Sequence, residues 1–411
     1  MNLKDFSLAT PVIQNGEVLK ALETAIPPEA IDTVLQQTNS HSNRTRSLPA
    51  HLVVCLVIAM SLWSRDSMPD VLKNLVDGLT EAWVKVNKYW RVPCKSAITQ
   101  ARQRLGPRVI SQLFDQLVRP MATTQTIGAF LKGLRIVVID GTTFDVPDSE
   151  VNARVFGRPG TRPGITAAFP KVRLVILIEA GTHLIFDALM CPYRMGERVR
   201  ALKLLRSVEL GMLLMWDRGL HSYAMVQATL ARGCEYLGTI PANVKFLVED
   251  PLPDGSYLSL IYPPAKFRKQ GSQPIQLRVI EYTIEHPERP EEKLTYRLIT
   301  SLLNFEVFPA ELLACEYHQR WEVENTINEI KTHLIGRKTP IRSQNPREVV
   351  QEVYGWLLGH WVVRLLMFQT ASEANIAPLR LSFTGTLRVI RRAIPKFQRL
   401  QIEELPLFST G

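Results

Sequence analysis

The chain has 411 residues, 46% of them hydrophobic, and a formal net charge of +10 at pH 7. This length and apolar content suffice for two or three domains with sizeable cores, which excludes a disordered or fibrous protein. The excess of Lys and Arg favours a polyanionic partner, either nucleic acid or an anionic membrane surface. The longest apolar runs, 52–63 and 349–368, are too short or too interrupted to span a bilayer, so we expect core helices and no membrane partner.

The cysteines and the N-terminus bear on the compartment. Five cysteines lie far apart, without C-x-x-C spacing: Cys55, Cys94, Cys191, Cys234 and Cys315. An odd number at such spacing favours reduced thiols over a disulfide framework or a zinc site. The first residues lack the apolar stretch of a secretory signal. We therefore expect a cytoplasmic protein.

The pattern is helical from Pro49 to about Arg119, and the segment 91–135 is strongly basic. It holds eight Lys and Arg residues against one acid, Asp115. Lys95, Arg102 and the turn 104–108 would place positive charge along a helix and its end, as in a surface that follows a phosphate backbone. A merely solvated helical surface is the alternative reading of the same charges.

A mixed α/β core is predicted after residue 134. The apolar run 135–139 is typical of a buried strand and stops at Asp140. A predicted hairpin (172–179 and 183–189) follows, then a helix (198–210), a strand (212–216), a helix (223–232) and a strand (234–239). This alternation predicts strands and helices packed in layers.

The rest of the chain is predicted to be a β insertion followed by helices. Between 241 and 302, turn sequences separate β-prone runs such as 277–284 and 294–300. Helix returns at Pro309, and a long helix is predicted over 346–371. The tail 377–400 contains no acid and six basic residues, which predicts a second basic surface: Arg380, Arg388, Arg391, Arg392, Lys396 and Arg399.

The stretch 317–331 has no Pro or Gly and predicts one amphipathic helix. At about 100° of rotation per residue, four polar side chains share a narrow arc beside the apolar stripe: Tyr317, Arg320, Glu324 and Lys331. Glu322 and Glu329 are predicted to point to solvent. On periodicity alone, an ordinary solvated face with an Arg320–Glu324 pair explains the same pattern.

Asp140 and Asp217 each follow an apolar strand directly, and ligand sites of α/β sheets form at the carboxyl ends of strands. Either one alone is also a good turn former. Together with Glu324 they would repel one another unless a divalent cation compensates them, and oxygen ligands suit Mg²⁺ or Mn²⁺. Two such ions can drive phosphodiester cleavage. His221 and His318 lie nearby and are interpreted as packing residues.

These residues resemble the DDE transposases of bacterial insertion sequences, specifically the insertion-sequence-four family. The family signature Y-(2)-R-(3)-E-(6)-K is matched without a gap by Tyr317, Arg320, Glu324 and Lys331. The blocks 140–149 and 214–222 are similar to the family's two aspartate regions, and 96–106 to its helical N-terminal domain. The likeness covers nearly the whole chain and is weakest after about residue 371.

The resemblance implies an RNase H-like, mixed-sheet α/β core interrupted by the β insertion, with helical N-terminal and C-terminal regions. The implied domains are a DNA-binding domain (1–132), a core (133–240 and 303–371), the insertion (241–302) and a basic C-terminal region (372–411). Asp140, Asp217 and Glu324 become the catalytic ligands of two Mg²⁺ ions, with Mn²⁺ as a substitute. Tyr317, Arg320 and Lys331 become phosphate contacts. Arg102 and Arg104 belong to the expected DNA-binding surface.

The function implied is a cut-and-paste transposase, nucleoid-associated in a bacterium. It would bind the inverted-repeat ends of its element as a homodimer, cleave them and join the 3′-hydroxyls to target DNA. A catalytically inactive DNA-binding regulator and a nuclease without strand transfer are the alternatives. Better-known relatives stack a Trp of the insertion on a flipped base during hairpin formation. Residues 218–317 contain no Trp, which leaves Phe267, Phe305 or Phe308 as substitutes and hairpin chemistry open.

Overall fold

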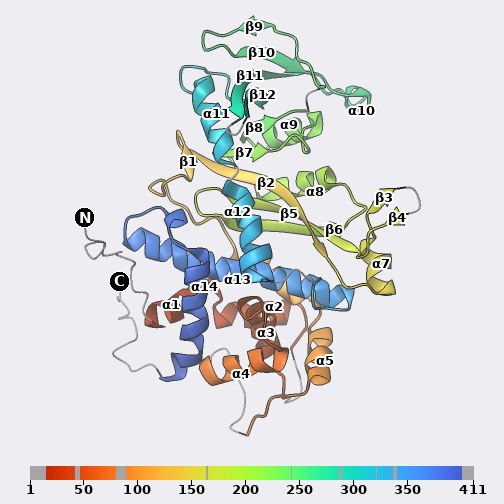
Figure 1. The fold of residues 1–411 in the computed structure, drawn as a ribbon, viewed down its shortest axis with the longest axis vertical. Helices are drawn as coiled ribbons and strands as arrows, with labels where there is room; N and C mark the ends of the chain where they lie inside the picture. Colours follow the sequence, from red (N-terminus) through yellow and green to blue (C-terminus); the bar gives the residue numbers. More distant parts are fainter. Residues whose placement is uncertain are drawn as a thin grey trace. The chain divides into compact units, whose positions relative to one another are not determined.

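The computed structural model describes residues 15–41, 47–79, 89–162, 165–241, 243–286, 289–320, 322–336 and 340–399. The chain folds into two compact units (Figure 1). Unit 1 takes the chain up to Arg119 and again from Asn328, and unit 2 takes Pro120–Ile327. Unit 1 is helical, and unit 2 is built on one large sheet.

The core of unit 2 is a five-stranded mixed sheet. Its strands are β2 (Leu134–Asp145), β5 (Lys171–Glu179), β6 (Leu184–Pro192), β7 (Met212–Trp216) and β8 (Glu235–Thr239). The order is β6-β5-β2-β7-β8, with antiparallel pairing among the first three strands and parallel pairing of β2 with β7 and of β7 with β8. This is the RNase H-like arrangement that the sequence predicted. The strands form where apolar, β-branched runs can be buried on both faces.

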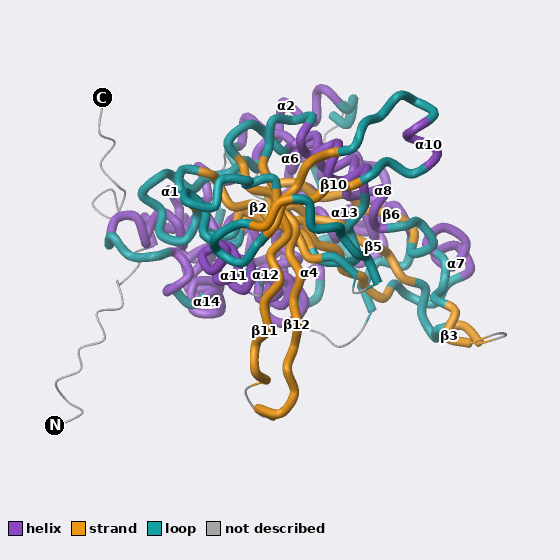
Figure 2. Tube along the Cα trace, turned by 90° about the horizontal axis from the view of Figure 1, so that it is seen from above, coloured by secondary structure: helices purple, strands orange, loops and turns teal. Residues whose placement is uncertain are grey.

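The predicted β insertion is present and extends the same sheet. It comprises β9 (Asp250–Pro251), β10 (Tyr257–Ile261), β11 (Ile275–His286) and β12 (Arg289–Thr300), in the order β8-β12-β11-β10-β9. β10 pairs with residues 275–279 of β11, and β8 pairs with residues 298–300 of β12. The remainder of β11 and β12 pair with each other as a two-stranded ribbon, which extends past the other strands in Figure 2.

Helices cover the sheet of unit 2. They are α7 (Glu150–Phe156), α8 (Glu197–Leu204), α9 (Tyr223–Leu230), α10 (Ala265–Arg268), α11 (Ala310–Gln319) and α12 (Glu322–Asn328). α8 packs on β2, β5 and β6, and α11 packs on β8 and β11. The predicted helix at 198–210 is shorter than expected, because α8 gives way to a 3₁₀ turn, η2 (Leu205–Ser207). The short strands β1 (Phe130–Leu131), β3 (Gly160–Arg162) and β4 (Ile165–Thr166) complete the unit.

Unit 1 is a helical assembly drawn from both ends of the chain. From the N-terminal side come α1 (Asn15–Ala25), α2 (Pro28–Gln37), α3 (Ala50–Leu62), α4 (Met68–Gly78), α5 (Lys95–Leu105) and α6 (Pro107–Leu117). From the C-terminal side come η3 (Glu329–Leu334), α13 (Pro346–Glu373), η4 (Pro378–Arg380), α14 (Phe383–Ala393) and η5 (Ile394–Arg399). The two apolar runs of the sequence are therefore core helices, α3 and α13, as predicted.

The close packing of α13 on α3 corrects the predicted domain boundaries. A Cβ on Gly355 would lie 2.6 Å from the carbonyl oxygen of Val57, so the two helices approach backbone to backbone. Helix 346–371 was assigned to the catalytic core, and the N-terminal domain was expected to end at residue 132. In the structure α13 belongs to unit 1, whose N-terminal part ends at Arg119. Within the described ranges, no helix has both the length and the apolar character needed to cross a membrane.

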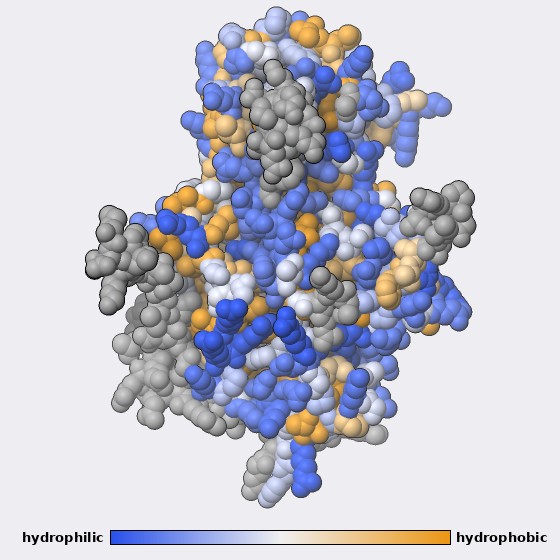
Figure 3. All heavy atoms as spheres, viewed as in Figure 1, coloured by the Kyte–Doolittle hydropathy of each residue, from blue (hydrophilic) through white to orange (hydrophobic). Residues whose placement is uncertain are grey.

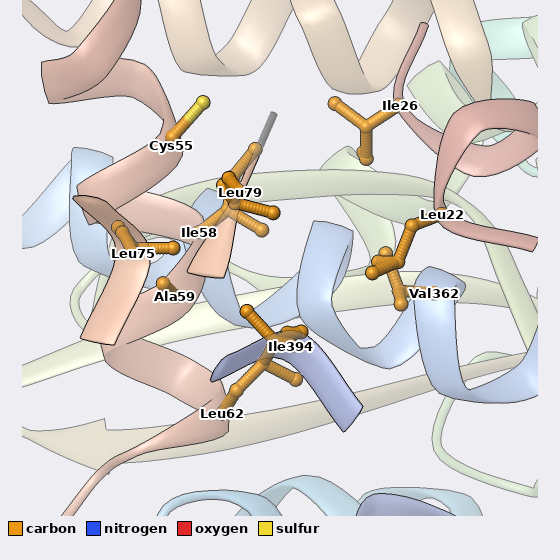
Figure 4. Close-up of a pocket in the computed structure, with 10 residues that line it drawn as sticks. All are labelled: Leu22, Ile26, Cys55, Ile58, Ala59, Leu62, Leu75, Leu79, Val362 and Ile394. Atoms are coloured by element: carbon orange, nitrogen blue, oxygen red, sulfur yellow. The ribbon is translucent and has the colours of Figure 1, made fainter. Parts of the chain in front are cut away.

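An apolar pocket lies inside unit 1 (Figure 4). Side chains of α1, α3, α4, α13 and η5 line it, among them Leu22, Cys55, Leu75, Val362 and Ile394. The labelled lining side chains are hydrophobic and offer no charged group that could orient a polar ligand. The pocket is therefore a feature of core packing, and the polar chemistry lies elsewhere.

Candidate active site

Asp140 and Asp217 lie at matching positions on neighbouring strands. The sequence predicted that the first strand stops at Asp140, but β2 continues to Asp145 and pairs Asp140 with Ile176 of β5. On its other side β2 runs parallel to β7, with Val138 opposite Met215. Asp140 lies two residues after Val138, and Asp217 lies two residues after Met215. Because side chains alternate along strands, the two carboxylates fall on the same face at the same level.

The Asp140 carboxyl is disfavoured as an anion, mainly by burial. Burial raises the pKa of the Asp140 carboxyl to about 6, and the nearby Asp217 and Glu197 carboxylates add to this. The backbone N–H of Gly141, which donates to Oδ1 of Asp140 at 2.7 Å, and the guanidinium of Arg320 act in the opposite direction. A carboxyl with this balance of neighbours is poorly compensated without a cation.

Glu197 is a third acidic side chain that acts electrostatically on the two aspartates, and its position was not predicted from the sequence. It is the first residue of α8, and Nη1 of Arg173 on β5 donates to its Oε2 at 2.7 Å. Burial raises the pKa of Glu197; Arg173 opposes this and Asp217 adds to it. No motif spacing marks this residue. The available signals were its position after Gly196, at a helix start, and the short distance along the chain from the predicted hairpin.

The stretch 317–331 is not the single α-helix that the sequence predicted. α11 ends at Gln319, α12 begins at Glu322, and the chain continues in the π-helix η3 from Glu329. In η3, the N–H of Ile335 donates to the carbonyl of Ile330, five residues back. A wider turn changes the rotation per residue, so the predicted arc does not extend through η3. Lys331 lies half-buried in η3, within unit 1.

Tyr317 anchors α11 to the sheet. It is 2% exposed, and its hydroxyl lies 2.8 Å from Thr239 Oγ1 and donates to the carbonyl of Trp216 at 3.2 Å. These contacts join α11 to the ends of β8 and β7, directly before Asp217. The Arg320 guanidinium carbon lies 5.3 Å from the centre of the Tyr317 ring. The expected phosphate contact is therefore not available to this buried hydroxyl, and the ring supports Arg320 instead.

The three glutamates of this stretch have different surroundings. Glu324 and Glu322 are exposed on α12. Glu329 was predicted to face solvent but is buried: its Oε2 accepts from Nε2 of His360 and from Nε of Arg364, both at 3.0 Å. The prediction was wrong because the π-turn alters the direction of the side chain and because α13 supplies two hydrogen-bonding partners, His360 and Arg364.

The oxygen ligands present fit a hard divalent cation. Asp140 and Asp217 offer carboxylate oxygens only, which Mg²⁺ and Mn²⁺ prefer, and their mutual repulsion favours binding a cation. In the part of the chain that the structure describes, no three His, Cys, Asp or Glu side chains are close enough to form a ready-made metal cluster. The pair of aspartates is thus the assembled part of the site, and Glu324 is exposed on α12.

The predicted DNA-binding arginines of unit 1 separate into two classes. Arg102 is 2% exposed, and its Nη2 donates to Ser343 Oγ at 2.9 Å and to the Glu348 carbonyl at 3.1 Å. It holds helices of the core together, which corrects the expectation that it follows a phosphate backbone. Arg104, two residues later on α5, is exposed as expected.

Other basic residues of unit 1 reach the surface near the C-terminus. Arg388 and Arg392 of α14 and Lys396 of η5 are exposed, whereas Arg391 donates through Nε to the carbonyl of Leu62. Hydrophilic side chains occupy much of the face drawn in Figure 3. The basic tail predicted from the sequence is therefore partly structural and partly available to an anionic partner.

Both histidines near the motifs pack as predicted. Nε2 of His318 lies 3.0 Å from the Tyr282 hydroxyl, and its ring meets those of Tyr282 and Tyr296 edge-on. Burial lowers the pKa of His318, and it lowers that of His221 to about 4. Phe267, a candidate for base stacking, packs against Tyr223 with ring centres 5.4 Å apart.

Comparison with known families agrees with this geometry. Residues 131–362 match the transposase DDE domain, and residues 17–115 match the N-terminal domain of insertion element 4 transposases. The chain is a DDE transposase of the insertion-sequence-4 family. Enzymes with this domain generally use divalent metal ions.

The relatives cover most of this transposase. It is 25% identical over 407 residues to the transposase InsG for insertion sequence element IS4 of Escherichia coli K12, covering 97% of this chain and 87% of that protein. It is 28% identical over 220 residues to the putative transposase InsZ of the same organism, covering 53% and 69%. The piggyBac transposase, solved in a synaptic complex with hairpin DNA, shares the fold with a TM-score of 0.51 at 12% identity, covering 96% of this chain and 87% of that one.

Proposed function

We propose that this transposase moves its insertion sequence by a cut-and-paste reaction. It binds the inverted-repeat ends of the element, hydrolyses phosphodiester bonds there, and transfers the 3′-hydroxyl ends to target DNA. The observation that carries this proposal is the pair Asp140 and Asp217, which lie at one level, in β2 and directly after the neighbouring β7, where burial raises the pKa of the Asp140 carboxyl. Such a pair is suited to binding cations at a phosphodiester bond.

Asp140, Asp217 and Glu324 are the residues that would hold two Mg²⁺ ions, with Mn²⁺ as a substitute. When bound, such ions activate the attacking oxygen and stabilise the leaving oxygen in a phosphodiester displacement. Asp140 and Asp217 come from the rigid sheet, and Tyr317 fixes the start of the Asp217 turn through the Trp216 carbonyl. Glu324 is exposed on α12 and would complete the ligand set when substrate is present.

Arg320 and Lys331 are assigned to the phosphates near the cleaved bond. Arg320 is supported by the Tyr317 ring and acts electrostatically on Asp140, so its charge lies close to the aspartate pair. A guanidinium there can bind a phosphate oxygen and keep the scissile bond beside Asp140. Lys331 has the family spacing from Glu324 and is assigned on that basis.

Double-stranded DNA is the partner that the charge distribution supports. The chain has a net charge of +10, and exposed arginines lie on α5 and α14 of unit 1, among them Arg104, Arg388 and Arg392. Lys and Arg side chains of this kind bind DNA by neutralising phosphates. We assign the N-terminal helices to end binding and expect a homodimer to hold two ends together, as the synaptic complex of the piggyBac transposase holds DNA.

The test is cleavage of DNA that carries the ends of the element, by purified protein in Mg²⁺ and in EDTA. We expect strand breaks and joined products only with Mg²⁺, and loss of both in Asp140→Asn and Asp217→Asn with end binding retained. Binding without metal-dependent breaks in the wild type would instead identify a regulator, and breaks without joined products would identify a nuclease. Full activity of either Asn variant would refute the assignment of the site.

A further inference from the structure

The first turn of α8 contacts the backbone next to both aspartates. Glu197 lies against Gly141, the residue that follows Asp140 in β2. A Cβ at Gly141 would overlap the carboxylate of Glu197, so only glycine leaves room for this contact. Gly141 points to the face of the sheet opposite to Asp140, because side chains alternate along a strand. Glu197 therefore supports the strand from behind Asp140 and is not placed as a ligand beside it.

Arg198, the next residue, contacts the turn that carries the second aspartate. Its Nε donates to the carbonyl oxygen of Gly219 at 2.6 Å. The N–H of the same glycine donates to Oδ1 of Asp217 at 3.0 Å. Gly219 thus links the Arg198 guanidinium to the carboxylate of Asp217 through its own peptide groups, and a change at Arg198 reaches Asp217 through one residue.

The first turn of α8 is itself held in place. Arg173 of β5 donates to Glu197 Oε2 at 2.7 Å, and α8 packs on β2, β5 and β6. The N-cap residue of α8 is Gly196, so neither Glu197 nor Arg198 caps the helix, and Arg198 is exposed.

We propose that Glu197 and Arg198 are positioning residues, which fix the backbones of Asp140 and Asp217 at the separation that binds a divalent cation. This inference rests on the proposed function. Residues that orient the ligands of a metal typically change metal affinity by roughly 10–100-fold when they are replaced. The effect is therefore measurable on the metal itself, without DNA and without turnover.

The experiment is Mn²⁺ binding to the full-length protein, followed by the electron paramagnetic resonance signal of free Mn²⁺. Glu197→Ala and Arg198→Ala are expected to raise the Mn²⁺ dissociation constant by about tenfold or more. Lys203→Ala, which removes an exposed cation from the same helix, should leave it unchanged. Unfolding temperatures verify that each variant is folded, and Glu197→Gln, with the same shape and no charge, is the second variant where Glu197→Ala fails to fold.

A double variant distinguishes positioning from a general loss of charge. Gly141→Ala displaces Glu197 and should weaken Mn²⁺ binding by itself. Gly141→Ala with Glu197→Ala removes the overlap, so it should bind Mn²⁺ no more weakly than Glu197→Ala alone. If the loss of Mn²⁺ affinity in the double variant equals the product of the two single losses, the proposal is overturned, because the two residues then act independently.

Asp140→Asn separates this inference from the proposed function. Wild-type binding of Mn²⁺ that is lost in Asp140→Asn and weakened in the Glu197 and Arg198 variants supports both. If Asp140→Asn loses Mn²⁺ binding but folded Glu197→Ala and Arg198→Ala bind Mn²⁺ with wild-type affinity, the positioning role alone is overturned. Equal binding by wild type and Asp140→Asn overturns the metal site, and with it both proposals.

Discussion

A buried carboxylate lies beside the start of strand β2 and a half-buried one lies further along the strand, and the two differ in the groups that surround them. Near the start, Glu179 of β5 accepts hydrogen bonds from Arg135, from Thr182 Oγ1 at 2.6 Å and from the backbone N–H of Ala122 at 3.0 Å. It is fully buried and surrounded by donors. Further along, Asp140 has two acids nearby, and burial raises its pKa to about 6.

The contrast shows how one strand serves both folding and chemistry. A buried carboxylate with several donors holds the hairpin β5–β6 and the segment before β2 in place. A half-buried carboxylate beside other acids adds no such stability, and it persists where binding a cation makes use of it. Glu179 of β5 and Asp140 of β2 lie in the same unit on paired strands, so the comparison does not depend on the arrangement of the two units.

The largest predicted effect is on the stability of the fold, at the buried carboxylate of Glu179. Glu179→Gln removes the charge that Arg135 and the surrounding donors require, and should reduce the free energy of unfolding by about 3–5 kcal/mol. Denaturant unfolding measures this. Glu150→Gln, at an exposed ion pair with Arg154, is the control and should change the unfolding free energy little. If Glu179→Gln reduced the free energy of unfolding as little as the control does, Glu179 would not be a stabilising carboxylate and its contrast with Asp140 would be refuted.

The next effect concerns which acid of α12 completes the site. Glu324→Gln should reduce end cleavage by on the order of 10²–10³-fold, since it removes a charged group that acts at the reacting phosphate. Glu322→Gln is the matched control, two residues away on the same helix and also exposed. Single-turnover cleavage of end DNA measures both. Equal losses in the two variants, or none in Glu324→Gln, would contradict the assignment.

A smaller effect is expected at the contact between α11 and the sheet. Tyr317→Phe removes the hydroxyl and leaves the Trp216 carbonyl and Thr239 without this partner, which should cost about 1–3 kcal/mol of unfolding free energy. Tyr262→Phe, at a side chain that is 60% exposed, serves as the control. Unchanged stability with weaker DNA binding would show that the Tyr317 hydroxyl contacts phosphate after all.

The smallest effect distinguishes the two arginines of α5. Arg104→Ala should weaken DNA binding and reduce its salt dependence by about one phosphate contact, while the fold keeps its stability. Arg102→Ala should destabilise the fold, because Ser343 and Glu348 lose a buried partner. Binding titrations over a range of salt, with thermal unfolding alongside, measure both. Weaker DNA binding for Arg102→Ala and lower stability for Arg104→Ala would contradict these two assignments.

The sheet and the two aspartates, Asp140 and Asp217, could be predicted from the sequence because the determining signals are local. Apolar runs such as 212–216 have no alternative to burial, and Asp217 follows that run directly. The β insertion was visible in its turn sequences for the same reason. The end of β2 was not, since Asp140 continues a strand whose pairing with β5 overrides the polar residue.

The errors came where distant partners decide the outcome. Glu329 is buried because α13 brings His360 and Arg364 to it, and a helical rotation counted from Tyr317 contains no information on that. Arg102 is buried for a similar reason. Glu197 was missed because it lies on helix α8 and its contact, Gly141, lies on strand β2, and no spacing rule connects them. Long-range packing of this kind also placed α13 in unit 1.

The central claim is that burial and the neighbouring acids disfavour the Asp140 carboxylate until a divalent cation binds. The most direct test is the unfolding temperature of wild type and of Asp140→Asn with Asp217→Asn, each in EDTA and in Mn²⁺. We predict that the variant is at least as stable as wild type in EDTA, and that Mn²⁺ raises the unfolding temperature of the wild type only, because a ligand stabilises the folded state that binds it. A variant less stable than wild type in EDTA, or equally stabilised by Mn²⁺, would contradict the claim.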